Sequence, residues 1–418
     1  MTATYTDRAA HIIARCREIA AFTQVPGETT RLFLTPPMHD VHALVRGWME
    51  DLGMTVHVDA IGNMRGLWAG IDPTAPRFLI GSHLDTVPNA GAFDGILGIV
   101  LGLAVIEELQ GKRLPFGIEV LAFSEEEGVR YAKPFLGSLA FTGKLGEDAL
   151  NRSDRNGITM RQAIQDYGLD PTQLPAAVLS DNAFAYLEFH IEQGPILERE
   201  NIPLGVVEAL VGQTRMELTF TGHSNHAGTT PMSLRHDAIV AAADWIVALE
   251  EYASAQEGLV ATVGKMEVLP GAANVIPGRV TASFDVRHAN DDIRKAAVDA
   301  MTKLAEDAAA RRGVKVAIQL QLEHTVVRLD PHLVSSLHKA ATRAGFSARN
   351  MTSGAGHDAM ILAPLVPSVM LFLRSPGGLS HHPDENVLPE DVEAALATAM
   401  EFLAQLRDDR ANLKDGHA

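Results

Sequence analysis

Residues 77–109, RFLIGSHLDTVPNAGAFDGILGIVLGLAVIEEL, carry the pattern that decides the fold. A short apolar run from Arg77 to Ser82 ends in glycine and serine, and it predicts a buried strand. A polar, turn-rich loop follows, and the residues from Gly95 to Leu109 are mostly apolar over a helical length. A buried strand followed by such a helix is the unit from which parallel sheets are built.

Further strand candidates repeat this pattern. Gly117 to Phe123 and Tyr186 to Ile191 are short apolar runs that predict buried strands. We therefore predict an α/β domain with a mainly parallel mixed sheet flanked by helices. In such domains the carboxyl ends of the strands carry the chemistry, and polar clusters follow the strand ends of this chain.

The pattern changes near Gly212. Alternating or strand-like segments occupy residues 214–221, 259–269, 279–287 and 314–322, and helical segments lie at about 234–252 and 291–312. The order β-α-β-β-α-β predicts a ferredoxin-like module with one solvated sheet face. We therefore expect a larger discontinuous domain, residues 1–211 and 328–418, and a small inserted domain, residues 212–327.

Length and charge narrow the class of protein. A chain of 418 residues exceeds the size at which single cores stop growing, so two domains are expected. The formal charge of −17, from 52 acidic and 35 basic residues, repels nucleic acid and anionic membrane, and neither is a predicted partner. An anionic substrate would need local positive charge.

The sequence predicts a cytoplasmic protein. Cys16 is the only cysteine, so no intrachain disulfide can form, which fits a reducing compartment. The first residues lack the uninterrupted apolar run of a signal peptide. The longest apolar stretch, Gly95 to Ile106, is too short to span a membrane.

Five polar clusters lie at expected strand ends or in loops: SHLD at 82–85, AFDG at 92–95, SEEEG at 124–128, EFHIEQGP at 188–195 and GGLSHHP at 377–383. Each has an ordinary alternative, such as a surface histidine, a solvated acidic loop, or Asp94 as a helix N-cap. Together they supply the histidine and carboxylate ligands that suit zinc or manganese. A bridging carboxylate with two further ligands per ion would make a two-metal site, which activates water and polarises a carbonyl.

Several of these segments resemble one enzyme family. GSHLDTVPNAGAFDGILG, SEEEGVRY, EFHIEQGP, GHSNHAGTTPM and GGLSHHPDE look like those of the allantoate amidohydrolase and N-carbamoyl-L-amino-acid hydrolase family. That family belongs to the aminoacylase and carboxypeptidase superfamily of two-metal hydrolases. The resemblance runs in order from about residue 30 to 387. The segments at residues 35–39 and 46–51 resemble the allantoate branch of this family more than its other branch.

The resemblance implies roles for matching residues. Two metal ions, zinc or manganese, would have these ligands: His83 and His190 for one ion, Glu127 and His381 for the other, and Asp94 as the bridge. Asp85 would orient His83, and Glu126 would be the general base. The triple glutamate 125–127 permits a frame slip, and we place the pair by its distance from Gly128. We choose His381 over His382 because the family pattern reads Ser-His-x-Pro.

The resemblance also implies substrate contacts. His226 would donate a hydrogen bond to the developing oxyanion, across a homodimer interface. Asn274 and Arg287 match substrate-binding positions, and Arg287 would supply the positive charge that a carboxylate needs. Without the family match, a surface salt bridge is the simpler interpretation of Arg287. Gln193 and His357 match further polar contacts.

We therefore expect a metal-dependent amidohydrolase that cleaves the ureido C–N bond of allantoate. The alternatives are an N-carbamoyl-L-amino-acid hydrolase or a β-ureidopropionase-type enzyme, and more distantly a dipeptidase or aminoacylase. His190 argues against the latter two, because their family usually has a carboxylate there. A non-catalytic binding protein is disfavoured because Glu126 and every expected metal ligand are present.

Overall fold

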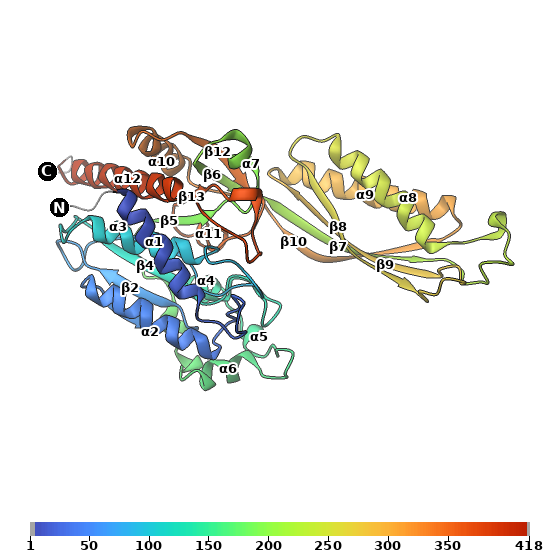
Figure 1. Cartoon of the computed structure of the whole chain (residues 1–418), viewed down its shortest axis with the longest axis horizontal. Helices are drawn as coiled ribbons and strands as arrows, with labels where there is room; N and C mark the ends of the chain where they lie inside the picture. Colours follow the sequence, from blue (N-terminus) through green and yellow to red (C-terminus); the bar gives the residue numbers. More distant parts are fainter. Residues whose placement is uncertain (1–4, 416–418) are drawn as a thin grey trace. The chain divides into compact units, whose positions relative to one another are not determined.

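The computed structural model describes residues 5–415, which form two compact units (Figure 1). Unit 1 comprises Met1–Glu208 and Arg328–Ala418 as far as they are described, and unit 2 comprises Ala209–Val327. The sequence placed the first boundary at residue 212. The two units part slightly earlier, just after the stretch of strand β6 (Leu204–Leu210) that pairs with β13 (Ser368–Leu373) through Val207.

Unit 1 is built on a nine-stranded mixed sheet with the order β1-β2-β4-β3-β5-β13-β6-β11, and β12 also pairs with β6. Its centre is parallel: β4 (Gly117–Phe123), β3 (Arg77–His83), β5 (Ala183–Ile191) and β13. Antiparallel pairs flank this centre, β2 against β4 and β6 against β13. The remaining strands are β1 (Thr55–Val58), β2 (Met64–Trp68), β11 (Val327–Arg328) and β12 (Ala348–Ser353).

Helices flank this sheet, as the sequence predicted. Helix α3 (Ile96–Glu108) is buried on all sides from Ile96 to Ile106, because it contacts β3 on one side and helices α1 (Tyr5–Ala20) and α12 (Pro389–Asp415) on the other. The other helices of unit 1 are α2 (Pro36–Asp51), α4 (Leu136–Phe141), α5 (Glu147–Leu150), α6 (Met160–Asp166), α7 (Ile196–Glu200), α10 (Pro331–Arg343) and α11 (Asp358–Leu362), with 3-10 turns η1 (Pro171–Ala177) and η3 (Pro376–Gly378).

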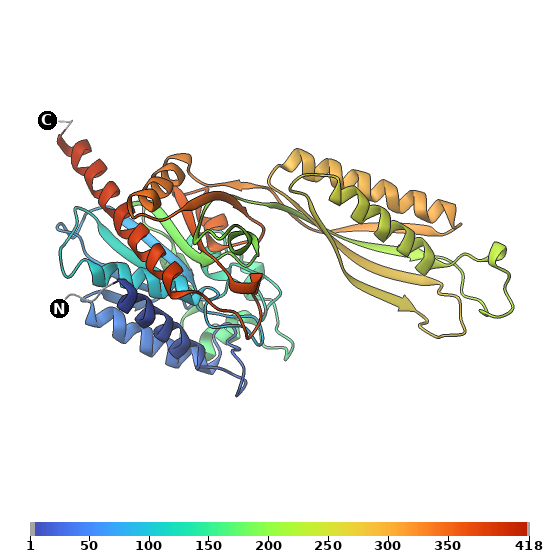
Figure 2. The same ribbon diagram turned by 45° about the horizontal axis from the view of Figure 1, so that its top comes forward.

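Unit 2 has the predicted β-α-β-β-α-β order. Its elements are β7 (Gly212–Thr221), α8 (Ala238–Ser254), β8 (Val260–Leu269), β9 (Arg279–His288), α9 (Asp291–Arg311) and β10 (Lys315–His324). The sheet has the order β10-β7-β9-β8 and is antiparallel throughout. Both helices lie on one face, over the alternate buried residues of β7 and β9 (Figure 2).

Helix α8 begins later than the sequence indicated. We expected it from about residue 234, but Met232–Leu234 forms the short 3-10 turn η2. Asp237 then caps the helix, because its carboxylate accepts hydrogen bonds from the N–H groups of Ile239 and Val240. Across the described residues, no helix has both the length and the apolar character needed to cross a membrane.

The core of unit 2 predicts a large effect at one side chain. Trp245 is fully buried, donates to the carbonyl of Met301 at 3.1 Å, and lies 5.8 and 5.7 Å, between ring centroids, from Phe220 and Phe284. We expect Trp245→Ala to lower the free energy of unfolding of unit 2 by about 3–5 kcal/mol, measured by urea titration followed by circular dichroism. Val247→Ala is the control on the same helix, since Val247 is 57% exposed, and it should cost less than about 0.5 kcal/mol. Similar losses in both variants would contradict this assignment of the core.

Candidate metal centre

The polar clusters of the sequence converge at one edge of the large sheet. His83 is the last residue of β3, and Glu125 to Glu127 follow the end of β4. His190 lies next to the end of β5, and the segment after β13 carries His381. These strands are parallel, so their carboxyl ends meet at the same edge, where a ligand site is expected.

The first group of candidate ligands is buried and tightly spaced. The Nε2 atoms of His83 and His190 each lie 3.2 Å from Oδ1 of Asp94, and they lie 3.5 Å from each other. All three side chains are almost fully buried. Two imidazole nitrogens and a carboxylate oxygen aimed at one point are a donor set that suits zinc or manganese.

The backbone fixes which ring nitrogen each histidine presents. Nδ1 of His83 lies 3.0 Å from the carbonyl oxygen of Asp85, and Nδ1 of His190 lies 3.0 Å from that of Ile191. A carbonyl oxygen can only accept, so each Nδ1 carries the proton. In the neutral ring Nε2 then keeps its lone pair, as a metal ligand requires.

A second group shares Asp94 with the first. Nε2 of His381 lies 3.5 Å from Oδ2 of Asp94 and 3.6 Å from Oε1 of Glu127. That Oε1 atom is buried and has no hydrogen-bond partner among the described residues. An unpartnered buried carboxylate oxygen beside a histidine is what a cation would satisfy. The residues present therefore fit two cations that share Asp94.

The capping interpretation of Asp94 is wrong. The N-cap residue of α3 is Gly95, and no side chain caps the first turn of the helix. Gly95 has a φ of +68°, and a Cβ there would lie 2.5 Å from the ring of His83. Glycine is thus required for the ring and the Asp94 loop to approach each other, and the Asp94 carboxylate faces the histidines.

The three adjacent glutamates have different environments. Glu125 points to the backbone, where its carboxylate accepts from the N–H groups of Phe33 and Arg130 at 3.1 and 3.2 Å. Glu126 and Glu127 instead form a potential ligand group with His83. Glu125 thus differs from Glu126 and Glu127, which are the two that lie with a histidine in a potential ligand group.

Burial and mutual repulsion disfavour ionisation of Glu126 and Glu127 together. Burial, and then the charge of Asp94, raises the pKa of Glu127 to about 8. Burial and the neighbouring carboxylates, Glu127 foremost, raise the pKa of Glu126 well above its usual range. A buried cation would reverse this crowding, which is a further respect in which the site fits metal ions.

Asp85 contacts both His83 and the glutamate pair after β4. Its backbone carbonyl accepts from His83, whereas its carboxylate oxygen Oδ1 lies 3.5 Å from that ring. The two carboxylate oxygens accept from the backbone N–H groups of Glu126 and Glu127 at 2.9 and 3.1 Å. Asp85 therefore fastens the end of β3 to the glutamate pair after β4.

Gln193 and His357 also lie at this site. Nε2 of Gln193 donates to Oδ2 of Asp94 at 2.8 Å. His357 is buried with its ring centroid 4.3 Å from that of His190, and its Nε2 lies 3.1 Å from Oγ of Ser353. Burial, and then the neighbouring His190, holds the pKa of His357 well below its usual value, so this imidazole is neutral.

The other expected substrate contacts belong to unit 2. His226 and Val275 form a β-bridge, and Ala227 donates to the carbonyl of Asn274 at 3.0 Å, so the His226 and Asn274 loops lie side by side. Arg287 lies elsewhere on the solvated sheet face, with its Nε 2.8 Å from Oδ1 of Asp285.

Sequence reasoning missed the residues that support these side chains. Ser380 donates to Oδ2 of Asp94 at 2.9 Å, and Glu385 accepts from the backbone of Phe93 and Asp94. Both residues belong to the segment GGLSHHPDE, in which the sequence pattern indicated only His381 as a ligand. In unit 2, Asp285 also accepts from Arg215, and nothing in the alternating strand pattern marked this ion pair.

A buried glutamate beside ligand groups of this kind is what an enzyme needs to activate water, so the fold and the site together define a metal-dependent hydrolase. Residues 79–406 match Peptidase family M20/M25/M40, and the chain belongs to this family. It is an amidohydrolase, a hydrolase of carbon–nitrogen bonds other than peptide bonds.

Individual relatives of this chain support the same assignment. Allantoate deiminase 1 of Glycine max is 38% identical over an aligned length of 428 residues. The match covers 94% of this chain and 89% of that protein. An N-carbamoyl-L-amino acid amidohydrolase of Geobacillus stearothermophilus is 38% identical, with coverages of 88% and 91%. The crystal structure of a hydantoinase/carbamoylase family amidase from Burkholderia ambifaria has a TM-score of 0.88 at 35% identity, with coverages of 95% and 97%.

Two adjacent histidines provide a matched test of the second ligand group. The side chains of His381 and His382 are both 49% exposed, but His382 lies near Asp384 and belongs to none of the ligand groups among the described residues. We expect His381→Ala to weaken binding of one Mn²⁺ ion at least about 100-fold, more than loss of a residue that only supports a ligand costs. His382→Ala should bind as the wild type does. Calorimetric titration of the apoproteins would measure both, and the reverse order would assign the ligand to His382.

Proposed function

We propose that this protein hydrolyses the ureido C–N bond of allantoate, with release of ammonia and carbon dioxide. The observation that carries this proposal is the pair of ligand groups that share Asp94, with Glu126 beside them. The similarity to allantoate deiminase 1, over 94% of this chain, supports the substrate. A cytoplasmic location of this protein stays a prediction, which rests on its single cysteine.

The proposed ligands are those implied by the sequence, for two divalent ions of zinc or manganese. His83, His190 and Asp94 would hold one ion, and Asp94, Glu127 and His381 would hold the other. Bound there, such ions lower the pKa of water and polarise the carbonyl that is attacked. Histidine and carboxylate ligands suit both metals.

Glu126 is the proposed general base. It is 8% exposed, it belongs to a ligand group with His83 and Glu127, and its backbone is held by Asp85. Its carboxylate would take a proton from the attacking water and return it to the leaving nitrogen. A positioned base of this kind contributes about 10²–10⁴-fold to the rate.

The proposed substrate contacts are those that the family resemblance implies. Arg287 would bind the substrate carboxylate with its planar guanidinium group, which supplies the local positive charge that a chain of net charge −17 must provide. Asn274, Gln193 and His357 would add polar contacts. His226 would donate to the carbonyl oxygen as it becomes an oxyanion, which can be worth about 3 kcal/mol in the transition state.

A second candidate substrate is an N-carbamoyl-L-amino acid. The N-carbamoyl-L-amino acid amidohydrolase of Geobacillus stearothermophilus and allantoate deiminase 1 of Glycine max are each 38% identical to this chain. Both substrates join a ureido or carbamoyl group to a carboxylate, so one set of side chains suits either. A β-ureidopropionase-type activity shares this chemistry.

A substrate panel separates these possibilities. With Mn²⁺ or Zn²⁺ supplied, we expect kcat/KM for allantoate to exceed that for N-carbamoyl-L-amino acids, β-ureidopropionate and dipeptides by at least about tenfold, which corresponds to 1.4 kcal/mol of transition-state binding. Glu126→Gln should bind metal normally but lose about 10²–10⁴-fold in kcat, because an amide cannot accept the proton. A preference for a carbamoyl amino acid would replace the proposed substrate. A fully active Glu126→Gln variant would move the base elsewhere.

We propose in addition that unit 2 forms a homodimer and acts as a lid. Its strand β8 lies at the edge of the sheet and exposes Val260, Met266 and Leu269 by 58, 47 and 48%. An apolar edge strand needs a covering partner, and both helices of this unit lie on one face of the sheet. The family resemblance implies that the partner subunit supplies His226.

Subunit exchange tests this arrangement. Glu126→Gln and His226→Ala should each be nearly inactive alone. In a mixed dimer one site would combine an intact Glu126 with an intact His226 of the partner subunit, so activity should return to about a quarter of wild type when exchange is random. The assay is ammonia release after mixing, with exchange verified by differently tagged subunits. If exchange occurs and activity stays at the level of the single variants, His226 acts within its own chain or not at all.

A further inference from the structure

The loop that carries Asp94 lies between two side chains from distant parts of the sequence. On one side, the ring of His83 occupies the space that a Cβ at Gly95 would take. On the other side, Glu385 lies against Gly91, where an added Cβ would be 2.3 Å from the Cβ of Glu385. The two glycines that flank Asp94 thus allow the loop to pass between an expected metal ligand and a buried carboxylate.

Glu385 holds this loop through the backbone. Its Oε1 accepts from the N–H group of Phe93 at 3.0 Å and from that of Asp94 at 2.9 Å. Its Oε2 lies 3.5 Å from Oγ of Ser380, which itself donates to Oδ2 of Asp94 at 2.9 Å. Glu385 is 4% exposed, so these contacts are protected from water. One carboxylate therefore binds the backbone N–H of Asp94 and lies close to the hydroxyl that contacts the Asp94 side chain.

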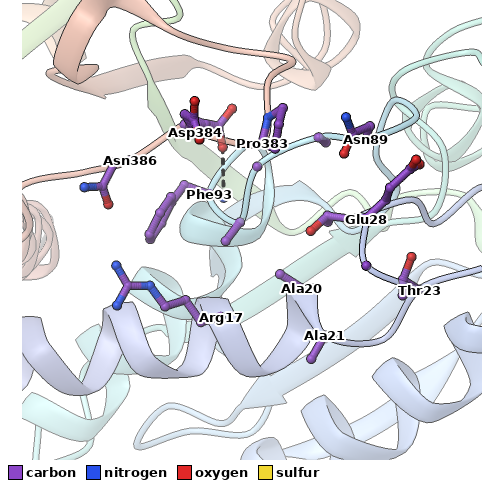
Figure 3. Close-up of a pocket in the computed structure, with 16 residues that line it drawn as sticks. Arg17, Ala20, Ala21, Thr23, Glu28, Asn89, Phe93, Pro383, Asp384 and Asn386 are labelled. Carbon is purple, nitrogen blue, oxygen red and sulfur yellow. Dashed lines mark hydrogen bonds between the residues drawn. The ribbon is translucent and has the colours of Figure 1, made fainter. Parts of the chain in front are cut away.

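The loop is not packed against protein on every side. A hollow of about 600 Å³ lies between it and helix α1, lined on one side by Arg17 and Ala20 and on the other by Pro383 and Asp384 (Figure 3). The start of the loop is fastened at Ala90, whose N–H donates to the carbonyl of Thr29 at 2.8 Å. Near its end, the N–H groups of Phe93 and Asp94 both donate to Glu385.

Glu385 also connects the two groups of candidate ligands. It stands four residues after His381 in the same segment, whereas Asp94 precedes α3, almost 300 positions earlier. Glu385 belongs to none of the ligand groups among the described residues. Its hydrogen bonds join the segment of one proposed ligand to the backbone of another.

We propose that Glu385 is a positioning residue that sets the place of Asp94 between the two metal ions and couples it to the His381 segment. This inference rests on the proposed function, because it takes Asp94 as the shared ligand. Outer partners that orient metal ligands typically contribute 10- to 100-fold to metal affinity. Glu385 would do so through the main chain, by aiming the Asp94 carboxylate before any ion binds.

The test is Mn²⁺ binding to the metal-free protein, measured by competition with a chromophoric chelator and independent of turnover. We expect Glu385→Ala to weaken binding about 10- to 100-fold. Glu385→Gln keeps an acceptor oxygen at the same place and should stay within about threefold of wild type. Glu385→Asp withdraws the acceptor by one methylene and should fall between them. It keeps the test decisive if the alanine variant does not fold.

Asp330 provides the matched control. Its carboxylate likewise accepts from two backbone N–H groups, those of His332 and Leu333, both at 2.9 Å, where it caps helix α10. Asp330→Ala should lower the thermal unfolding temperature of the metal-free protein and leave Mn²⁺ affinity unchanged. Wild-type affinity in Glu385→Ala, or equal weakening in Asp330→Ala, would overturn the proposal. If Asp94→Ala binds Mn²⁺ as the wild type does, the proposed metal site is wrong, and that outcome is distinct from a failure of Glu385 alone.

Discussion

The site depends on the placing of several carboxylates in one buried region at the edge of the large sheet. Asp94, Glu125, Glu126 and Glu385 are each less than a tenth exposed, and ionised acids are costly away from water. The protein meets this cost in two ways. Glu125 and Glu385 receive backbone N–H groups, and these acids hold loops. Asp94 faces histidines, and Oε1 of Glu127 has no hydrogen-bond partner among the described residues, so these acids are the ones proposed to bind cations.

Much of this arrangement could be predicted from the sequence because parallel strands bring their ends together. The runs that became β3, β4 and β5 are mainly apolar and read as parallel strands, so the polar residues at their carboxyl ends were expected to meet at one edge. The alternation of β9 likewise predicted a sheet with one covered face. These inferences need only local patterns and the geometry of a sheet.

The rest could not be predicted because it depends on contacts between distant loops. Glu385 follows Pro383 and Asp384, a local sequence typical of a solvated turn, and only the fold brings it beneath Phe93. Glu125 differs from its two neighbours because the backbone of Phe33 passes nearby, which no local pattern encodes. The start of α8 was misplaced for a simpler reason. The apolar residues of the η2 turn extend the helical pattern backwards, and the capping role of Asp237 decides the true beginning.

The partners of the two buried histidines have a consequence for how such a site changes in evolution. Both rings donate through Nδ1 to main-chain carbonyl oxygens, those of Asp85 and Ile191. Every amino acid carries that oxygen, so no single codon change at either position can delete it. The direction of the Nε2 lone pairs therefore depends on the backbone at the ends of β3 and β5. Side chains that are proposed to contact the substrate, such as Arg287, have no such protection, so specificity could change while the backbone contacts of the two histidines stay the same.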